Sequence, residues 1–110
     1  MAQFVLMLRD NGQFPAEISP EEIQQIIQRY SAWKEKVHAK GQKLFDGEGR
    51  IVVRKDGGIA VTDGPYVESK EVLGGYFLID ADDYAAVEKL VEDCPHLDFG
   101  SIEIRRIELA

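Results

Sequence analysis

Six apolar residues recur at spacings of three and four after Ser19, and this stripe constrains the fold more than any other feature of the chain. Ser19 can cap a helix, Pro20 suits its first turn, and Glu22 completes a capping box. Gly41 is expected to end the helix. A helix with one apolar face must pack on another apolar surface. The stripe consists of Ile23, Ile26, Ile27, Tyr30, Trp33 and Val37.

The rest of the chain supplies strand-like segments for that helix to cover. Asp56, Gly57 and Gly58 form a hairpin turn, because glycine accepts the positive φ that such turns require. Asp80 to Asp83 supplies caps for a second helix that stops by Pro95. Its apolar face consists of Tyr84, Val87, Leu90 and Val91. The predicted strands are Gln3 to Leu8, Arg50 to Arg54, Ile59 to Thr62, Leu73 to Ile79 and Ser101 to Leu109, and Lys43 to Phe45 begins a further one.

The order of these elements is strand, helix, hairpin strands, strand, helix, strand. It predicts an α+β fold of the ferredoxin-like βαββαβ type, in which two helices cover one face of an antiparallel sheet. The 110 residues of the chain suit a single domain, 1–110. The other sheet face then has no cover, so we expect two copies to pack face to face as a homodimer.

Charge and cysteine content exclude several classes of partner. A formal net charge of -7 disfavours attraction to nucleic acid and to anionic membranes. No stretch approaches the roughly 20 apolar residues that span a bilayer. Cys94 is the only cysteine, so no internal disulfide can form, and we expect a cytoplasmic protein.

The most unusual stretch is DGPYVESKEVLGGYFLI, from Asp63 to Ile79. It begins with a rigid turn, continues as a charged loop, and reaches Gly74 and Gly75, where a backbone or ligand can come close. The charged side chains can act as acid, base or electrostatic groups in a desolvated dimer cleft, or form a salt-linked surface turn. The candidate ligand-binding residues here are Asp63, Glu68, Lys70, Glu71 and Tyr76.

This stretch resembles the signature of the DGPF-type branch of the YCII-related family, and the likeness extends over essentially the whole chain. The resemblance implies a dimeric α+β barrel, and it brings no assigned activity. The chemistry proposed for the YCII branch uses a first-helix histidine paired with an aspartate, but Gln28 to Trp33 contains no histidine. The matching residues are Asp63, Gly64, Pro65, Tyr66, Glu68, Lys70, Glu71, Leu73, Gly74, Gly75 and Tyr76.

Further candidates have alternative structural roles. Arg9 can hold an anionic ligand or solvate a strand end, and Tyr30 with Trp33 can line a cavity or fill the core. His38, late in the first helix, suits a solvated surface. Cys94 and His96 are too few to make a metal site, and Cys94 suits a buried structural position. We expect no metal and no cofactor.

The sequence therefore favours a small-molecule-binding enzyme with a cleft near the dimer sheet interface, and leaves its reaction and substrate open. The alternative is a non-catalytic binding or regulatory module that acts through protein contacts. For this alternative, the resemblance to the DGPF-type branch implies a link to sigma-factor transcription regulation. A third reading is a dimer whose interior is filled by side chains and binds nothing.

Overall fold

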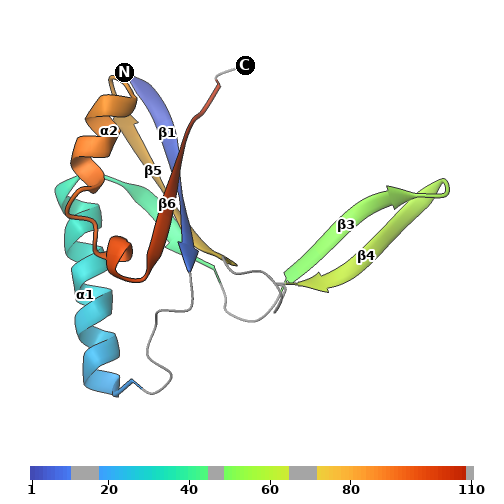
Figure 1. The fold of residues 1–110 in the computed structure, drawn as a ribbon, viewed down its shortest axis with the longest axis horizontal. Helices are drawn as coiled ribbons and strands as arrows, with labels where there is room; N and C mark the ends of the chain where they lie inside the picture. The colour runs from blue at the N-terminus through green and yellow to red at the C-terminus, as the bar shows by residue number, and fades with distance from the viewer. Residues whose placement is uncertain (11–17, 45–48, 65–71, 109–110) are drawn as a thin grey trace.

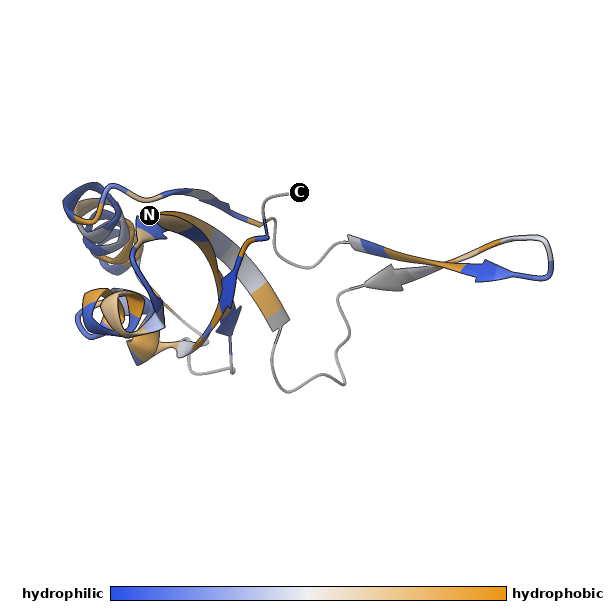
Figure 2. Cartoon of the chain, turned by 90° about the horizontal axis from the view of Figure 1, so that it is seen from above, coloured by the Kyte–Doolittle hydropathy of each residue, from blue (hydrophilic) through white to orange (hydrophobic). Residues whose placement is uncertain are grey.

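The computed structural model describes residues 1–10, 18–44, 49–64 and 72–108. Four strands form an antiparallel sheet in the order β2-β5-β1-β6, and both helices lie on one face of it (Figures 1 and 2). This is the predicted ferredoxin-like α+β arrangement. The elements are β1 (Ala2–Asp10), α1 (Pro20–Lys36), β2 (Lys40–Lys43), β3 (Gly49–Lys55), β4 (Gly58–Gly64), β5 (Val72–Ala81), α2 (Tyr84–Val91), a short 3-10 helix η1 (Pro95–Asp98) and β6 (Gly100–Arg106).

The hairpin forms as predicted, but it is not part of this sheet. Strands β3 and β4 pair only with each other, and the ribbon projects away from the helices (Figure 1). Asp56 and Gly57 take the positive φ values of the turn, 49° and 80°. The second strand of the main sheet is instead β2, which begins at Lys40 and not at Lys43. Its sequence KGQK carries no β-branched residue, so only its pairing with β5 makes it a strand.

The prediction that Gly41 ends the first helix is wrong. Helix α1 begins as expected, with the Ser19 hydroxyl accepting from the Glu22 amide at 3.1 Å, but it ends at Lys36. His38 lies beyond that end and takes the left-handed conformation itself, with φ 57°. Gly41 lies in β2 with φ 146°, where a Cβ would approach the Tyr76 carbonyl oxygen to 2.0 Å. Glycine is needed there for strand pairing.

The hydrophobic core lies between the sheet and the two helices. Along β1, alternate residues point to the helices and are buried. Trp33 of α1 packs on Phe77 of β5, with ring centroids 5.3 Å apart. The described residues cover only part of the α1 stripe, because Ile23 and Ile27 keep 42% and 51% exposure. The core comprises Phe4, Leu6, Leu8, Trp33, Ala39, Phe77, Ile79, Ala81, Val87 and Cys94.

The opposite face of the sheet carries a second, partly exposed apolar set. Cross-strand pairs place Val5 beside Leu78 and Met7 beside Tyr76 on the two central strands. We call the surface formed by these four residues the open face. No described helix covers it, and Figure 2 shows both helices on the other side. None of the described helices is long and apolar enough to cross a membrane.

The close approach at Gly41 predicts an unequal response to alanine substitution within one chain. We expect Gly41→Ala to lower the free energy of unfolding by more than about 2 kcal/mol, because Cβ would displace the backbone of β5. Gly58→Ala is the control, since its Cβ would meet only the Lys55 carbonyl oxygen at 3.8 Å. Urea denaturation measures both, and equal stabilities would contradict the role of Gly41.

Candidate functional site

Three polar side chains from distant parts of the sequence meet at the carboxyl end of β1. Asp10 ends β1, Tyr30 comes from α1 and His96 comes from η1. The His96 ring is buried, with 2% exposure, and its Nδ1 lies 2.9 Å from the Tyr30 hydroxyl. Its Nε2 lies 2.9 Å from the Arg9 carbonyl oxygen and 4.0 Å from Oδ1 of Asp10. We call Asp10, Tyr30 and His96 the β1-end cluster.

The hydrogen bonds of the neutral imidazole fix its tautomer. A carbonyl oxygen can only accept, so Nε2 of His96 carries the proton and donates it to Arg9. Nδ1 then accepts from the Tyr30 hydroxyl. Burial, followed by the charges of Cys94 and Asp10, raises the pKa of Tyr30 well above its usual value, so the phenol keeps its proton and remains a donor.

Glycine residues make room for this cluster. The ladder between β1 and β5 shifts after Leu8, which leaves Gly74 as the extra residue of a bulge. A Cβ on Gly74 would lie 2.5 Å from Oδ2 of Asp10, and a Cβ on Gly100 would lie 1.8 Å from the Arg9 carbonyl oxygen. The first glycine of the Gly74–Gly75 pair in the sequence motif therefore leaves the space that the Asp10 carboxylate occupies.

Arg9 points away from the cluster, to the other side of the sheet. Strand alternation puts its side chain on the same side as the open face, where its guanidinium lies 3.3 Å from the Glu103 carboxylate. Arg105 lies 3.4 Å from the other oxygen of Glu103. The predicted anion-binding role of Arg9 therefore involves a guanidinium that already pairs within the chain.

The residues selected from the sequence do not form one site in the described part of the chain. Tyr76 lies on the open face, whereas Tyr30 and Trp33 lie on the helix side of the sheet. The Trp33 indole donates to the Leu90 carbonyl and to Asp93, so its packing and hydrogen bonds are those of a core residue. Asp63 lies in β4 opposite Arg50. The other candidates lie outside the described residues, namely Glu68, Lys70 and Glu71.

Cys94 occupies the buried position expected for a structural thiol. It is 3% exposed, and burial raises its pKa to about 11, so the reactive thiolate is scarce near neutral pH. Among the residues that the structure describes, no three histidine, cysteine, aspartate or glutamate side chains are grouped to hold a metal ion. Cys94 and His96 thus belong to the packing between η1 and the sheet.

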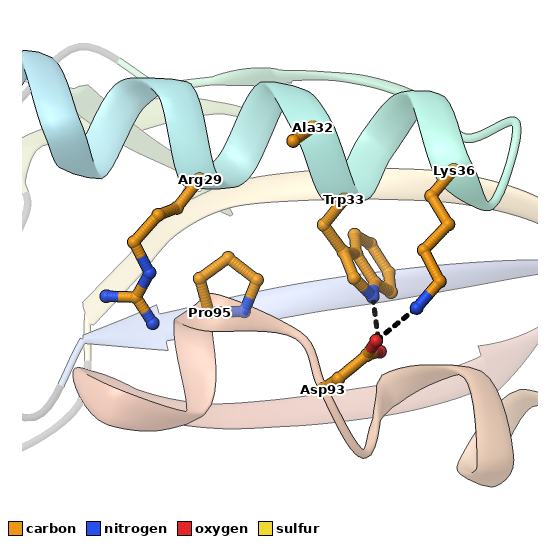
Figure 3. Close-up of a pocket in the computed structure, with 6 residues that line it drawn as sticks. All are labelled: Arg29, Ala32, Trp33, Lys36, Asp93 and Pro95. Atoms are coloured by element: carbon orange, nitrogen blue, oxygen red, sulfur yellow. Dashed lines mark hydrogen bonds and ion pairs between the residues drawn. The ribbon is translucent and has the colours of Figure 1, made fainter.

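A shallow groove of about 250 Å³ lies between α1 and the segment before η1 (Figure 3). Three of its lining residues bond to one another, since Asp93 accepts from both Trp33 and Lys36. The Lys36 hydrogen bond holds the pKa of Asp93 below its usual value. Because ligand pockets usually enclose about 300 Å³ or more, we regard this groove as a packing contact. It is lined by Arg29, Ala32, Trp33, Lys36, Asp93 and Pro95.

Comparison with known proteins identifies the family. A family model described as the YCII-related domain matches residues 2–109. The chain belongs to the YCII-related family. No curated protein matches it. One similar solved structure is the 5-chloro-2-hydroxyhydroquinone dehydrochlorinase TftG from Burkholderia phenoliruptrix, in complex with 2,5-dihydroxybenzoquinone, with 18% identity and a TM-score of 0.45. The match covers 98% of this chain and 95% of that one.

Reasoning from the sequence of this YCII-related protein missed two members of the β1-end cluster. The strand predicted from the sequence ends at Leu8, before Asp10, and the sequence suggests His96 only as a metal ligand together with Cys94. The structure continues β1 through Asp10, because it pairs with β5 on one side and β6 on the other. The available signal was Gly74, whose missing side chain marks a close approach by another group.

The tautomer of His96 can be observed directly. We expect long-range nitrogen NMR spectra to show a protonated Nε2 and an unprotonated Nδ1, because the Arg9 carbonyl accepts and the Tyr30 hydroxyl donates. His38 is exposed and serves as the internal reference for an imidazole that exchanges between tautomers. A protonated Nδ1 in neutral His96 would contradict the assignment.

Cys94 is expected to resist alkylation in the folded protein. At about pH 8, iodoacetamide should label it at least about 100-fold more slowly than it labels the urea-unfolded chain, because burial both shields the thiol and raises its pKa to about 11. Intact-mass spectrometry measures both rates. Comparable rates in the two states would show that the thiol is accessible, contrary to its burial.

Proposed function

We propose that this YCII-related protein is a small-molecule-binding enzyme that transfers protons at the β1-end cluster and works as a homodimer. The observation that carries the proposal is the pairing of a reachable carboxylate with a buried, oriented imidazole. The Asp10 side chain is 32% exposed, whereas that of His96 is 3% exposed and both its ring nitrogens have partners. A base open to substrate and held beside a fixed second group is what general acid–base chemistry requires.

In this proposal Asp10 exchanges a proton with the substrate, because it is the more exposed partner of its pair with His96. Nε2 of His96 lies 4.0 Å from Oδ1 of Asp10, so the charge of the imidazole acts directly on the carboxylate. Tyr30 keeps the imidazole in one orientation through Nδ1. The pair would stand in for the aspartate and first-helix histidine proposed for the YCII branch, which this chain cannot form, because here the histidine comes from η1.

The homodimer in the proposal follows from the open face. Its four residues form an apolar strip along β1 and β5, and the flanking positions on the edge strands β2 and β6 are polar or charged. An apolar centre with a polar rim is the usual composition of a protein interface. Packing two open faces together would cover the strip and bring the carboxyl ends of the β1 strands to the edge of the interface. We place the substrate cleft at this edge, where the Asp10 carboxylate is 32% exposed.

The proposal predicts that Asp10→Asn abolishes turnover and leaves the fold intact. We would incubate the protein with a cellular metabolite extract and follow depletion of small molecules by mass spectrometry. The wild type should consume a compound that Asp10→Asn consumes at least about 100-fold more slowly, because the amide cannot accept the proton. Asp82→Asn is the matched control, because Asp82 is an exposed carboxylate that lies far from Asp10. Asp82 follows the end of β5, and this end of β5 pairs with the start of β1, whereas Asp10 lies at the end of β1.

Equal turnover by Asp10→Asn and the wild type would remove Asp10 from the reaction. If the wild-type protein consumes no compound in the extract, the proposal that it is an enzyme is contradicted. The alternative of a regulatory module stays a prediction. It would be favoured if the chain consumed no metabolite but bound a protein partner.

A further inference from the structure

The β3–β4 hairpin exposes apolar side chains that a folded chain normally covers. Five large aliphatic residues on it keep between 45% and 62% of their surface exposed. A two-stranded ribbon is at best marginally stable alone in water, since it buries little apolar area. The ribbon therefore needs a surface to lie on. The five residues are Ile51, Val52, Val53, Ile59 and Val61.

Both faces of the ribbon are apolar at their centres. The register pairs Val52 with Val61 on one face, and Val53 with Ala60 on the other. Strands that are apolar on both faces are characteristic of sheets covered on both sides, whereas a solvated strand alternates apolar with polar residues. The hairpin thus has the composition of a buried element in an exposed position.

The position of the hairpin relates it to the open face. It extends on the side of the sheet opposite to the helices, which is the side that the open face looks toward (Figures 1 and 2). A body that covers the open face therefore lies next to the hairpin. One partner can cover both apolar surfaces.

The areas favour a partner that covers both. Four strands about 4.8 Å apart and about seven residues long give the open side of the sheet roughly 450 Å², whereas a stable interface buries about 800 Å² on each partner. The ribbon is about 24 Å long, and each of its faces adds roughly 240 Å². The sheet and both faces of the arm together come to roughly 900 Å², which reaches the area that a stable dimer needs.

Charge favours a second copy of this chain as that partner. The hairpin carries three basic residues, Arg50, Arg54 and Lys55, and two acidic ones, Asp56 and Asp63. The whole chain has a net charge of -7, so the body outside the hairpin is strongly acidic. A slightly basic arm and an acidic body attract each other between copies, and a two-fold dimer makes this contact twice.

We propose that the β3–β4 hairpin is a dimerisation arm that lies against the body of a second copy while the open faces pack together. This inference rests on the homodimer of the proposed function and adds a second contact to it. Each copy gives an arm and receives one, so the arms hold the two sheets in place around the cleft.

The test removes the apolar contact and keeps the ribbon. In Val52→Lys with Val61→Glu, the new charges face each other across the strands, which preserves their pairing and the net charge. Val53→Lys with Ala60→Glu does the same on the other face. The control is Ile23→Glu with Ile27→Lys, which removes two similarly exposed apolar residues from α1 and forms a favourable helical pair. Analytical ultracentrifugation measures the dimer dissociation constant, and circular dichroism checks folding.

We expect each hairpin variant to raise the dissociation constant at least about 30-fold, and the helix control to leave it unchanged. A wild-type dimer whose affinity survives both hairpin variants would overturn the arm and leave the homodimer standing. A wild-type monomer would overturn both. Activity is not used in this test, so its result is separate from that of Asp10→Asn.

Hydrogen exchange gives a measurement on the unmodified protein. If the arm lies on a second copy, the amides of β3 and β4 should exchange more slowly as protein concentration rises, because a larger fraction of the protein is then dimeric. The amides of β1, which pairs on both sides within one chain, provide the internal reference. Concentration-independent exchange in the hairpin would overturn the proposal even if every variant misfolded.

Discussion

The structure depends on the pairing of β1 with β5 on one side and with β6 on the other. Because every backbone group along a central strand has a partner, the strand continues through Arg9 and Asp10, where the sequence turns polar. Strand alternation then separates the two polar residues. Arg9 joins the charges beside the open face, and Asp10 joins Tyr30 and His96 on the helix side. The same alternation that builds the core therefore divides the candidate chemistry between two faces.

The β1-end cluster exists because backbones approach closely at glycines. Gly74 leaves space for the Asp10 carboxylate, and Gly100 lets β6 pass the Arg9 carbonyl that holds His96. The buried imidazole is satisfied on both nitrogens, so its orientation costs little to keep, whereas a buried polar group without partners would cost about 1–3 kcal/mol. The geometry of the cluster is thus part of the fold, and the proposed proton transfer requires such preorganisation.

The exposed apolar surfaces connect the fold to assembly. The open face and the hairpin lie on the same side, away from the helices, and neither is covered by a described part of the chain. In the proposed dimer, two copies would bury both surfaces and bring the ends of their β1 strands near the interface. The proposed cleft would then depend on the dimer, so association would link stability to substrate binding.

The sequence by itself determined the helix starts, the hairpin turn and the alternation of the strands, because capping, positive φ and side-chain period are set by neighbouring residues. It also determined the family, through the motif from Asp63 to Tyr76. Only the tertiary structure decided that KGQK is an edge strand, that the hairpin leaves the sheet, and that residues 10, 30 and 96 meet. These features depend on contacts between segments far apart in the chain, and local residue preferences carry no information about which segments those are.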